Sequence, residues 1–185
     1  WLQQSLQMTH IAVESINTSG HVLICGYGRS GQAMGRMLEQ EGIATLALDL
    51  DPDRVHQARA AGQAVAYGDA TKAPTLTAAG LARARAVVLT YLHLPPPLRT
   101  PVMHKLVQAL KPGGVLLLEA FHPRQLQYSS GGPKNEAMLY TLDMLRGDLA
   151  AGMQELLGSE SETLLDEGPG HQGPAYVTRW IGQKI

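Results

Sequence analysis

The chain of 185 residues has almost no cysteine, almost no net charge and no long apolar run. The single cysteine, Cys25, excludes an intrachain disulfide framework and a CxxC metal site. A formal net charge of −1, without a stripe of lysine and arginine, argues against a nucleic-acid-binding surface. No apolar run approaches the roughly 20 residues of a membrane span, and no signal segment opens the chain. We therefore expect a cytoplasmic protein without a nucleic-acid or membrane partner.

The remaining composition is that of a globular protein, with 44% hydrophobic and 17% charged residues. The length favours one domain with a substantial core. Residues 1–20 predict a lead-in helix and linker, because their scattered apolar positions end in N-T-S-G. The domain then covers residues 21–185. Since the chain begins at Trp1 and not at Met, we expect that an upstream piece is missing.

A glycine-rich loop follows the first predicted strand. The apolar run His21–Cys25 predicts a buried strand, in which Cys25 is an inert thiol. The loop G-Y-G-R-S-G occupies residues 26–31, and a helix is predicted over residues 32–40. A second apolar strand, residues 44–48, ends on Asp49, 23 residues after Gly26. This order of strand, loop, helix, strand and acid is the context that a dinucleotide-binding GxGxxG requires.

Each residue type in this pattern has a physical role. Gly26 permits the tight turn, Gly28 lets a pyrophosphate approach the backbone, and Gly31 allows close packing of helix on strand. The helix N-terminus offers N–H groups and a partial positive charge to phosphates. Asp49 would accept hydrogen bonds from ribose hydroxyls. We expect this strand-end carboxylate to lie outside the core, so that its removal would leave the fold intact.

The first half resembles a known regulatory family. The strings C-G-Y-G-R-S-G, A-L-D-L-D-P-D-R-V and Y-G-D-A-T, with further strands near residues 63–67 and 85–91, resemble the RCK N-terminal (TrkA-N) domain of Kef- and Trk-type potassium transport systems. The resemblance covers residues 21–91 and implies binding of NAD(H) or AMP as a regulatory ligand, without chemistry. Helix capping is a second, compatible role for Asp69. The predicted cofactor-binding residues are Gly26, Tyr27, Gly28, Arg29, Ser30, Gly31, Asp49, Leu50, Asp69, Ala70 and Thr90.

The second half resembles a different family. The strings L-K-P-G-G-V-L-L-L-E-A-F, P-R-Q-L-Q-Y-S-S-G-G-P and D-E-G-P-G-H-Q-G-P-A resemble the C-terminal half of small class I S-adenosylmethionine (SAM)-dependent methyltransferases of the tellurite-resistance type, over residues 92–185. Three prolines predict a rigid loop over residues 92–99. Two strands, near residues 155–165 and 175–181, close this half. The polar candidates near strand ends are His93, Glu119, His122, Tyr128, Glu167 and His171. Their spacing follows no metal-ligand pattern, so we expect no metal site and interpret these residues as structural.

The sequence of the glycine loop favours NAD(H) or AMP over SAM as the ligand. The corresponding loop of methyltransferases has the pattern acid-x-G-x-G-x-G. When Gly26 and Gly28 are aligned with its first two glycines, Ile24 occupies the position of the acid and Ser30 that of the third glycine. We therefore expect a non-catalytic module for NAD(H) or AMP and no catalytic residue. A SAM-dependent small-molecule methyltransferase, with SAM as cofactor, is the alternative.

The two families share one fold class, an α/β doubly wound sheet. We predict a three-layer Rossmann-like domain with strand order 3-2-1-4-5-7-6 and an antiparallel seventh strand. Residues 85–91 serve as the fourth strand in both families, so a junction there preserves register. A junction within a strand that both families share favours an engineered chimera of two fragments. For the oligomeric state, a homodimer is an alternative to a monomer.

Overall fold

The computed structural model describes residues 18–166, 168 and 170–185. The predicted lead-in helix lies almost wholly outside these residues and stays a prediction. A single sheet of seven strands runs through the molecule in the order β3-β2-β1-β4-β5-β7-β6, and β7 is antiparallel to β5. The sequence prediction of the sheet is therefore confirmed, including the direction of its seventh strand. Within the described residues no helix is long and apolar enough to cross a membrane.

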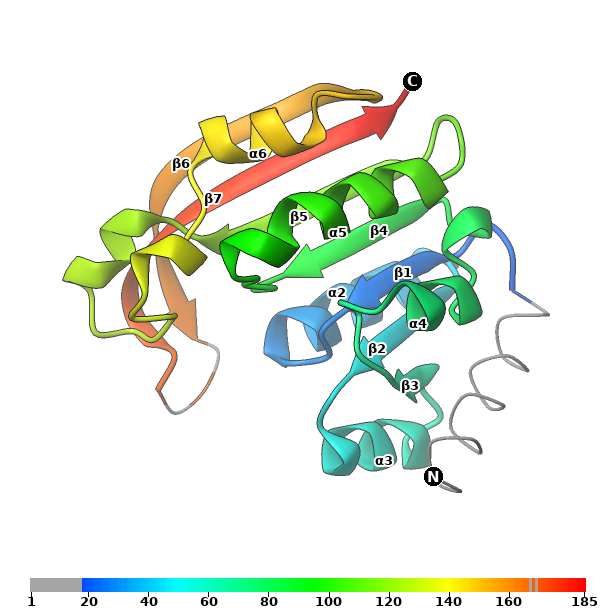
Figure 1. Ribbon diagram of the computed structural model, residues 1–185. Coiled ribbons are helices and arrows are strands. Elements are labelled where there is room, and N and C mark those ends of the chain that lie inside the picture. Colours follow the sequence, from blue (N-terminus) through cyan, green and yellow to red (C-terminus); the bar gives the residue numbers. More distant parts are fainter. Residues whose placement is uncertain (1–17, 167, 169) are drawn as a thin grey trace.

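Figure 1 shows the elements along the chain. The strands are β1 (Val22–Cys25), β2 (Thr45–Asp49), β3 (Val65–Tyr67), β4 (Ala86–Thr90), β5 (Val115–Phe121), β6 (Met153–Asp166) and β7 (Gln172–Lys184). The helices are α2 (Arg29–Gln40), α3 (Pro52–Ala60), α4 (Ala73–Ala78), α5 (Pro96–Ala109) and α6 (Leu142–Leu149), with short 3₁₀ turns at Leu81–Arg83, Pro123–Gln127 and Glu136–Met138.

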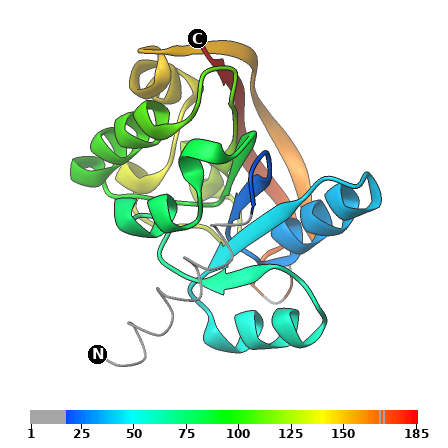
Figure 2. The same cartoon turned by 90° about the vertical axis from the view of Figure 1, so that its right-hand side faces the viewer.

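The two faces of the sheet are covered unequally (Figure 2). Helices α4, α5 and α6 lie on one face, where Leu23, Leu106 and Trp180 belong to the larger core. Helices α2 and α3 lie on the other face and pack mainly over β1, β2 and β3, around Ile24 and Val55. Within the part of the chain that the structure describes, no helix covers β5, β7 and β6 on that second face.

Strand β4 joins the two halves of the sheet. It pairs in parallel with β1 through four residues and with β5 through five. All three central residues of β4 are buried. The two segments that resemble different families therefore share one continuous ladder, with the change of resemblance directly after β4.

The predicted proline loop is shorter than expected. Helix α5 already begins at Pro96, so Pro96 and Pro97 occupy its first turn. Proline is tolerated there because the first helical N–H groups have no intrahelical partner and φ is already suitable. The prediction of a rigid loop through Arg99 was therefore wrong: three prolines in a row marked the start of a helix.

Candidate functional site

The glycine loop has the geometry that its residue types predict. Gly26 has a φ of 105°, a conformation that L side chains rarely adopt, and its N–H donates to the carbonyl of Leu48 at 2.8 Å. A Cβ on Gly31 would overlap the carbonyl oxygen of Gly26. Gly28 is different, because nothing lies within 4 Å of a Cβ there. Two of the glycines are thus required by the fold, while the third leaves open space above the loop.

Helix α2 begins directly above this open space. Its N-cap is Gly28, which has no side chain to accept a hydrogen bond, and its first turn has no acidic residue. The positive end of the helix dipole is therefore not neutralised by the helix itself. Arg29 adds a positive charge, and its Nη1 contacts the Asp166 carboxylate at 3.2 Å. That contact links the glycine loop to the distant end of β6, and sequence reasoning did not find it.

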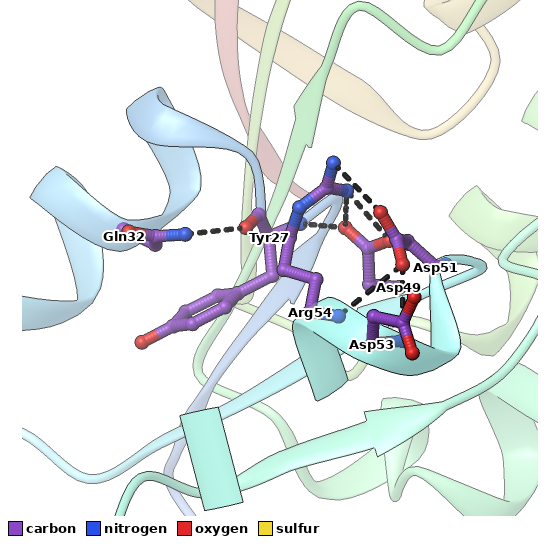
Figure 3. Close-up of polar contacts among 6 residues, drawn as sticks. All are labelled: Tyr27, Gln32, Asp49, Asp51, Asp53 and Arg54. Carbon is purple, nitrogen blue, oxygen red and sulfur yellow. Dashed lines mark hydrogen bonds and ion pairs between the residues drawn. The ribbon is translucent and has the colours of Figure 1, made fainter. Parts of the chain in front are cut away.

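Asp49 connects the glycine loop to β2 and α3 (Figure 3). The backbone N–H groups of Tyr27 and Asp51 donate to its carboxylate at 2.6 and 2.8 Å. The Nη1 of Arg54 lies 2.9 Å from both oxygens of Asp49. Only 7% of Asp49 is exposed. The expectation that Asp49 lies outside the core was wrong. Because its carboxylate contacts three segments, we now expect its removal to cost stability.

Arg54 is a site residue that sequence reasoning missed. It lies in the first turn of α3, whose N-cap Asp51 accepts hydrogen bonds from the backbone N–H groups of Asp53 and Arg54. That turn directs the guanidinium to both Asp49 and Asp51, with a contact of 3.2 Å to the latter. The signal was present in the string D-L-D-P-D-R, where a capping acid precedes a base by three residues.

A cavity of about 210 Å³ opens at the carboxyl ends of β1, β2 and β4. Such a position, beyond the strand ends, is where open α/β sheets bind ligands. The predicted residues Gly26, Asp49, Leu50, Asp69, Ala70 and Thr90 all line it. Leu50 is 57% exposed and gives the rim an apolar surface. Ser30 instead lines a larger hollow on the second face of the sheet.

Asp69 does not cap a helix. Its carboxylate accepts hydrogen bonds from the N–H and hydroxyl groups of Thr71 at 2.9 and 2.6 Å, whereas α4 begins only after Lys72. The capping role considered for Asp69 is replaced by a local turn, because the chain needs three more residues to reach the helix. This turn orients Asp69 at the mouth of the cavity.

The thiol of Cys25 is buried beneath the site. It is 2% exposed, and burial raises its pKa to about 12. The predicted burial of this thiol is confirmed, and a raised pKa agrees with low reactivity.

The polar candidates of the second half have structural partners. Glu119 pairs with Arg179 at 2.5 Å, Tyr128 donates to Glu162 at 2.8 Å, and His122 lies 3.4 Å from Glu160. Among the described residues no group of histidine, cysteine, aspartate or glutamate could hold a metal ion. Glu167 lies outside the described residues.

His93 gives a prediction about pH. Burial lowers its pKa; its Nδ1 lies 2.7 Å from the Met138 carbonyl and its Nε2 accepts from the N–H of Phe121. Protonation would place a hydrogen on that accepting nitrogen. Below the ordinary pKa of about 6.5 the unfolded chain binds the proton and the folded chain does not. We expect the free energy of unfolding to fall from pH 7.5 to pH 5.5, less steeply in His93→Gln, as urea titrations would measure. Parallel pH profiles of the two proteins would contradict this.

The comparison with known families finds a match to the first half of the chain. Residues 22–93 match the TrkA-N domain family. An efflux antiporter, KefB of Alkalimonas amylolytica, is 41% identical over 88 residues, which are 48% of this chain and 13% of that protein. The glutathione-regulated potassium-efflux system protein KefC of Cronobacter sakazakii is 43% identical over 67 residues, 36% of this chain and 11% of that protein. The chain therefore spans only a small part of either relative.

Solved structures match the whole chain instead. A SAM-dependent methyltransferase from Methanosarcina mazei aligns with a TM-score of 0.66 and 15% identity, over 95% of this chain and 97% of that one. One from Archaeoglobus fulgidus aligns with a TM-score of 0.62 and 15% identity, over 97% and 94%. These identities show a shared fold alone. The chain thus combines a segment similar to the TrkA-N family with a fold that it shares with small methyltransferases, as the sequence predicted.

Proposed function

We propose that this protein is a non-catalytic nucleotide-binding module for NAD(H) or AMP. The observation that carries the proposal is that Gly26 of the glycine loop and Asp49 line one cavity, while open space lies over Gly28 of the same loop. A carboxylate at the end of β2 suits ribose hydroxyls, and an uncapped helix N-terminus suits phosphate. The resemblance of residues 21–91 to nucleotide-binding regulatory domains implies the same ligand class.

The size of the cavity favours a single nucleoside within it. Its volume of about 210 Å³ is below the roughly 300–1,000 Å³ of pockets that enclose a drug-sized ligand. An adenosine group therefore fits between Leu50, Asp69 and Thr90, with its phosphates outside, over the glycine loop. The nicotinamide half of a dinucleotide would have to lie beyond this cavity.

A SAM-dependent methyltransferase is the second candidate, supported by the whole-chain fold. The loop disfavours it. Ile24, at the position of the methyltransferase acid, is fully buried against α2, so nothing there receives a methionine amine. The adenosine subsite, with Asp49 and Asp69, serves either cofactor.

The same observations support an origin by fusion of two fragments. The match to the TrkA-N family ends at residue 93, just after β4, while the sheet continues without interruption through β5, β7 and β6. Placement of a junction beside a strand common to both folds is what a designer would choose. We include engineered recombination in the proposal.

Titration calorimetry with NADH, NAD, AMP, ATP and SAM tests the ligand class. We expect an adenine nucleotide to bind at least tenfold more tightly than SAM. Ile24→Asp provides the matched comparison, because it introduces the acid of the methyltransferase loop. On our proposal this variant does not improve SAM binding, since it buries an unpaired carboxylate. Tightest binding to SAM by the parent chain would overturn the proposal.

A further inference from the structure

A hollow of about 320 Å³ lies between α4 and α5, on the face of the sheet opposite to α2 (Figures 1 and 2). Its floor is part of the larger core, since Leu76, Leu81 and Leu106 line it and are each at most 4% exposed. The side chains on the facing sides of the two helices are mostly short, so the space between them stays unfilled. These short residues are Ala73, Pro74, Thr77, Pro101, Val102 and Ala109.

The size of the hollow suits a small molecule. Its volume of about 320 Å³ falls at the lower end of the roughly 300–1,000 Å³ of ligand pockets. Leu98, which is 49% exposed, extends the apolar lining to the rim. The hollow shares one lining residue, Thr71, with the cavity that contains Asp49. It is therefore a second site, and a ligand there does not depend on the nucleotide proposal.

The charged residues that line the hollow are both positive. They are Lys72 and Lys105, and no aspartate or glutamate lines it with them. Both lysines are exposed, and within the described part of the chain neither forms an ion pair. The surrounding sequence has the same sign, because residues 70–118 contain six lysines and arginines and no acid, in a chain of net charge −1. Asp69, the acid before this stretch, lines the other cavity. The potential at the rim of the hollow therefore favours an anion.

We propose that the hollow binds an aliphatic carboxylate as a single small molecule. The chain lies over the leucines of the floor, and the carboxylate lies at the rim, between Lys72 and Lys105. The ammonium group of lysine is a point charge with three donors on a flexible stem, so both lysines reach one carboxylate. A purely apolar ligand would make no use of the two lysines, and a small inorganic anion would leave the apolar floor in water.

Titration calorimetry of the full chain with hexanoate, octanoate and decanoate, each kept below its micelle concentration, tests the proposal. We expect affinity to rise about threefold to fourfold for each added methylene group, because each buries further apolar surface. The increase should stop at the chain length that fills the hollow. Decylammonium, which has the same chain and the opposite charge, should bind at least tenfold more weakly than decanoate.

Two variants test the two halves of the site separately. Ala109→Leu fills the hollow and should weaken decanoate at least tenfold, whereas Gln108→Leu adds the same side chain at the neighbouring exposed position, which does not line it. Lys72→Gln combined with Lys105→Gln should weaken decanoate about fivefold to tenfold, as the loss of two exposed ion pairs predicts. Lys134→Gln, an exposed lysine away from the hollow, is the matched control. Both controls should change affinity less than twofold.

Circular dichroism verifies that each variant folds, and Thr77→Leu on the opposite wall replaces Ala109→Leu if that protein does not. Absence of saturable decanoate binding would overturn the proposal, as would equal affinities of a variant and its control. Sedimentation with phosphatidylglycerol vesicles tests for an anionic bilayer as the partner. Binding to these vesicles without binding of monomeric decanoate would also overturn the proposal.

Discussion

Gly31→Ala is expected to destabilise the protein by more than about 3 kcal/mol. The added Cβ would overlap the carbonyl oxygen of Gly26, which belongs to the backbone and cannot move aside as a flexible side chain can. Relief requires α2 to shift away from β1, and the packing of Tyr27 and Ile24 beneath the helix would be lost with it. Denaturant titration followed by circular dichroism measures the loss as a lower midpoint.

Gly28→Ala is the matched control for this prediction. Gly28 has a φ of −65°, which alanine adopts readily, and open space surrounds the position of its Cβ. We expect its stability to be unchanged or raised by up to about 1 kcal/mol. Nucleotide affinity should nevertheless fall, because the new methyl group occupies the approach to the helix N-terminus. Equal destabilisation by both substitutions would show that the loop in solution differs from this structure.

The fold was predictable because its signals are local and repeat. Each parallel strand is a short, almost wholly apolar run, and a helix with apolar positions at helical spacing usually follows it. Such alternation leaves few topologies for a sheet. The antiparallel last strand followed from the turn-rich string between β6 and β7. Even so, the start of α5 at Pro96 escaped prediction, because proline is compatible both with a rigid loop and with a helix N-terminus.

The site was predictable in part. Gly26 and Asp49 were predicted from spacing and Asp69 from the family resemblance, and all three line one cavity beyond the strand ends. The hydrogen bonds and ion pairs that hold these residues in place were not predicted. The pairing of Arg29 with Asp166 joins residues 137 positions apart, which no local pattern encodes.

The conformation of Tyr91, at the junction of the two segments, was likewise not predictable from local sequence. Directly after β4 it adopts a φ of 54°, rare for a residue with a side chain, while its ring packs against Phe121 with a centroid distance of 4.7 Å. The positive φ turns the chain out of the sheet at the point where the resemblance changes. The sequence around Tyr91 contains no glycine, so no local signal predicts this conformation.

Strand β4 pairs with β1 of the first segment and with β5 of the second, and this explains how the two segments form one sheet. Its buried side chains face α2 on one side and α5 on the other, through Val88 and Val87. Any fragment that supplies a parallel fifth strand with apolar residues on both faces can pair with it. On the second face α2 and α3 pack mainly over β1, β2 and β3, so the described helices leave the strands of the second segment uncovered there.

Asp49→Ala is expected to lower both stability and nucleotide affinity. Loss of the carboxylate leaves the N–H groups of Tyr27 and Asp51 without their acceptor and Arg54 without its closest partner, at a cost of about 1–3 kcal/mol for a buried group left unpaired. A lost charged partner for ribose hydroxyls weakens an adenosine ligand roughly tenfold to a hundredfold. Calorimetry at a temperature where the variant is fully folded separates the two effects.

Asp51→Ala provides the contrast that assigns a role to Asp49. Asp51 caps α3 and pairs with Arg54, so its loss should cost about 1 kcal/mol of stability. It does not line the cavity, and affinity for AMP or NADH should change less than about threefold, or below roughly 0.7 kcal/mol. If both variants weaken the ligand equally, the acids act through Arg54 and the position of α3. If neither weakens it, the carboxylate of Asp49 serves only to hold the glycine loop, and the ligand binds elsewhere.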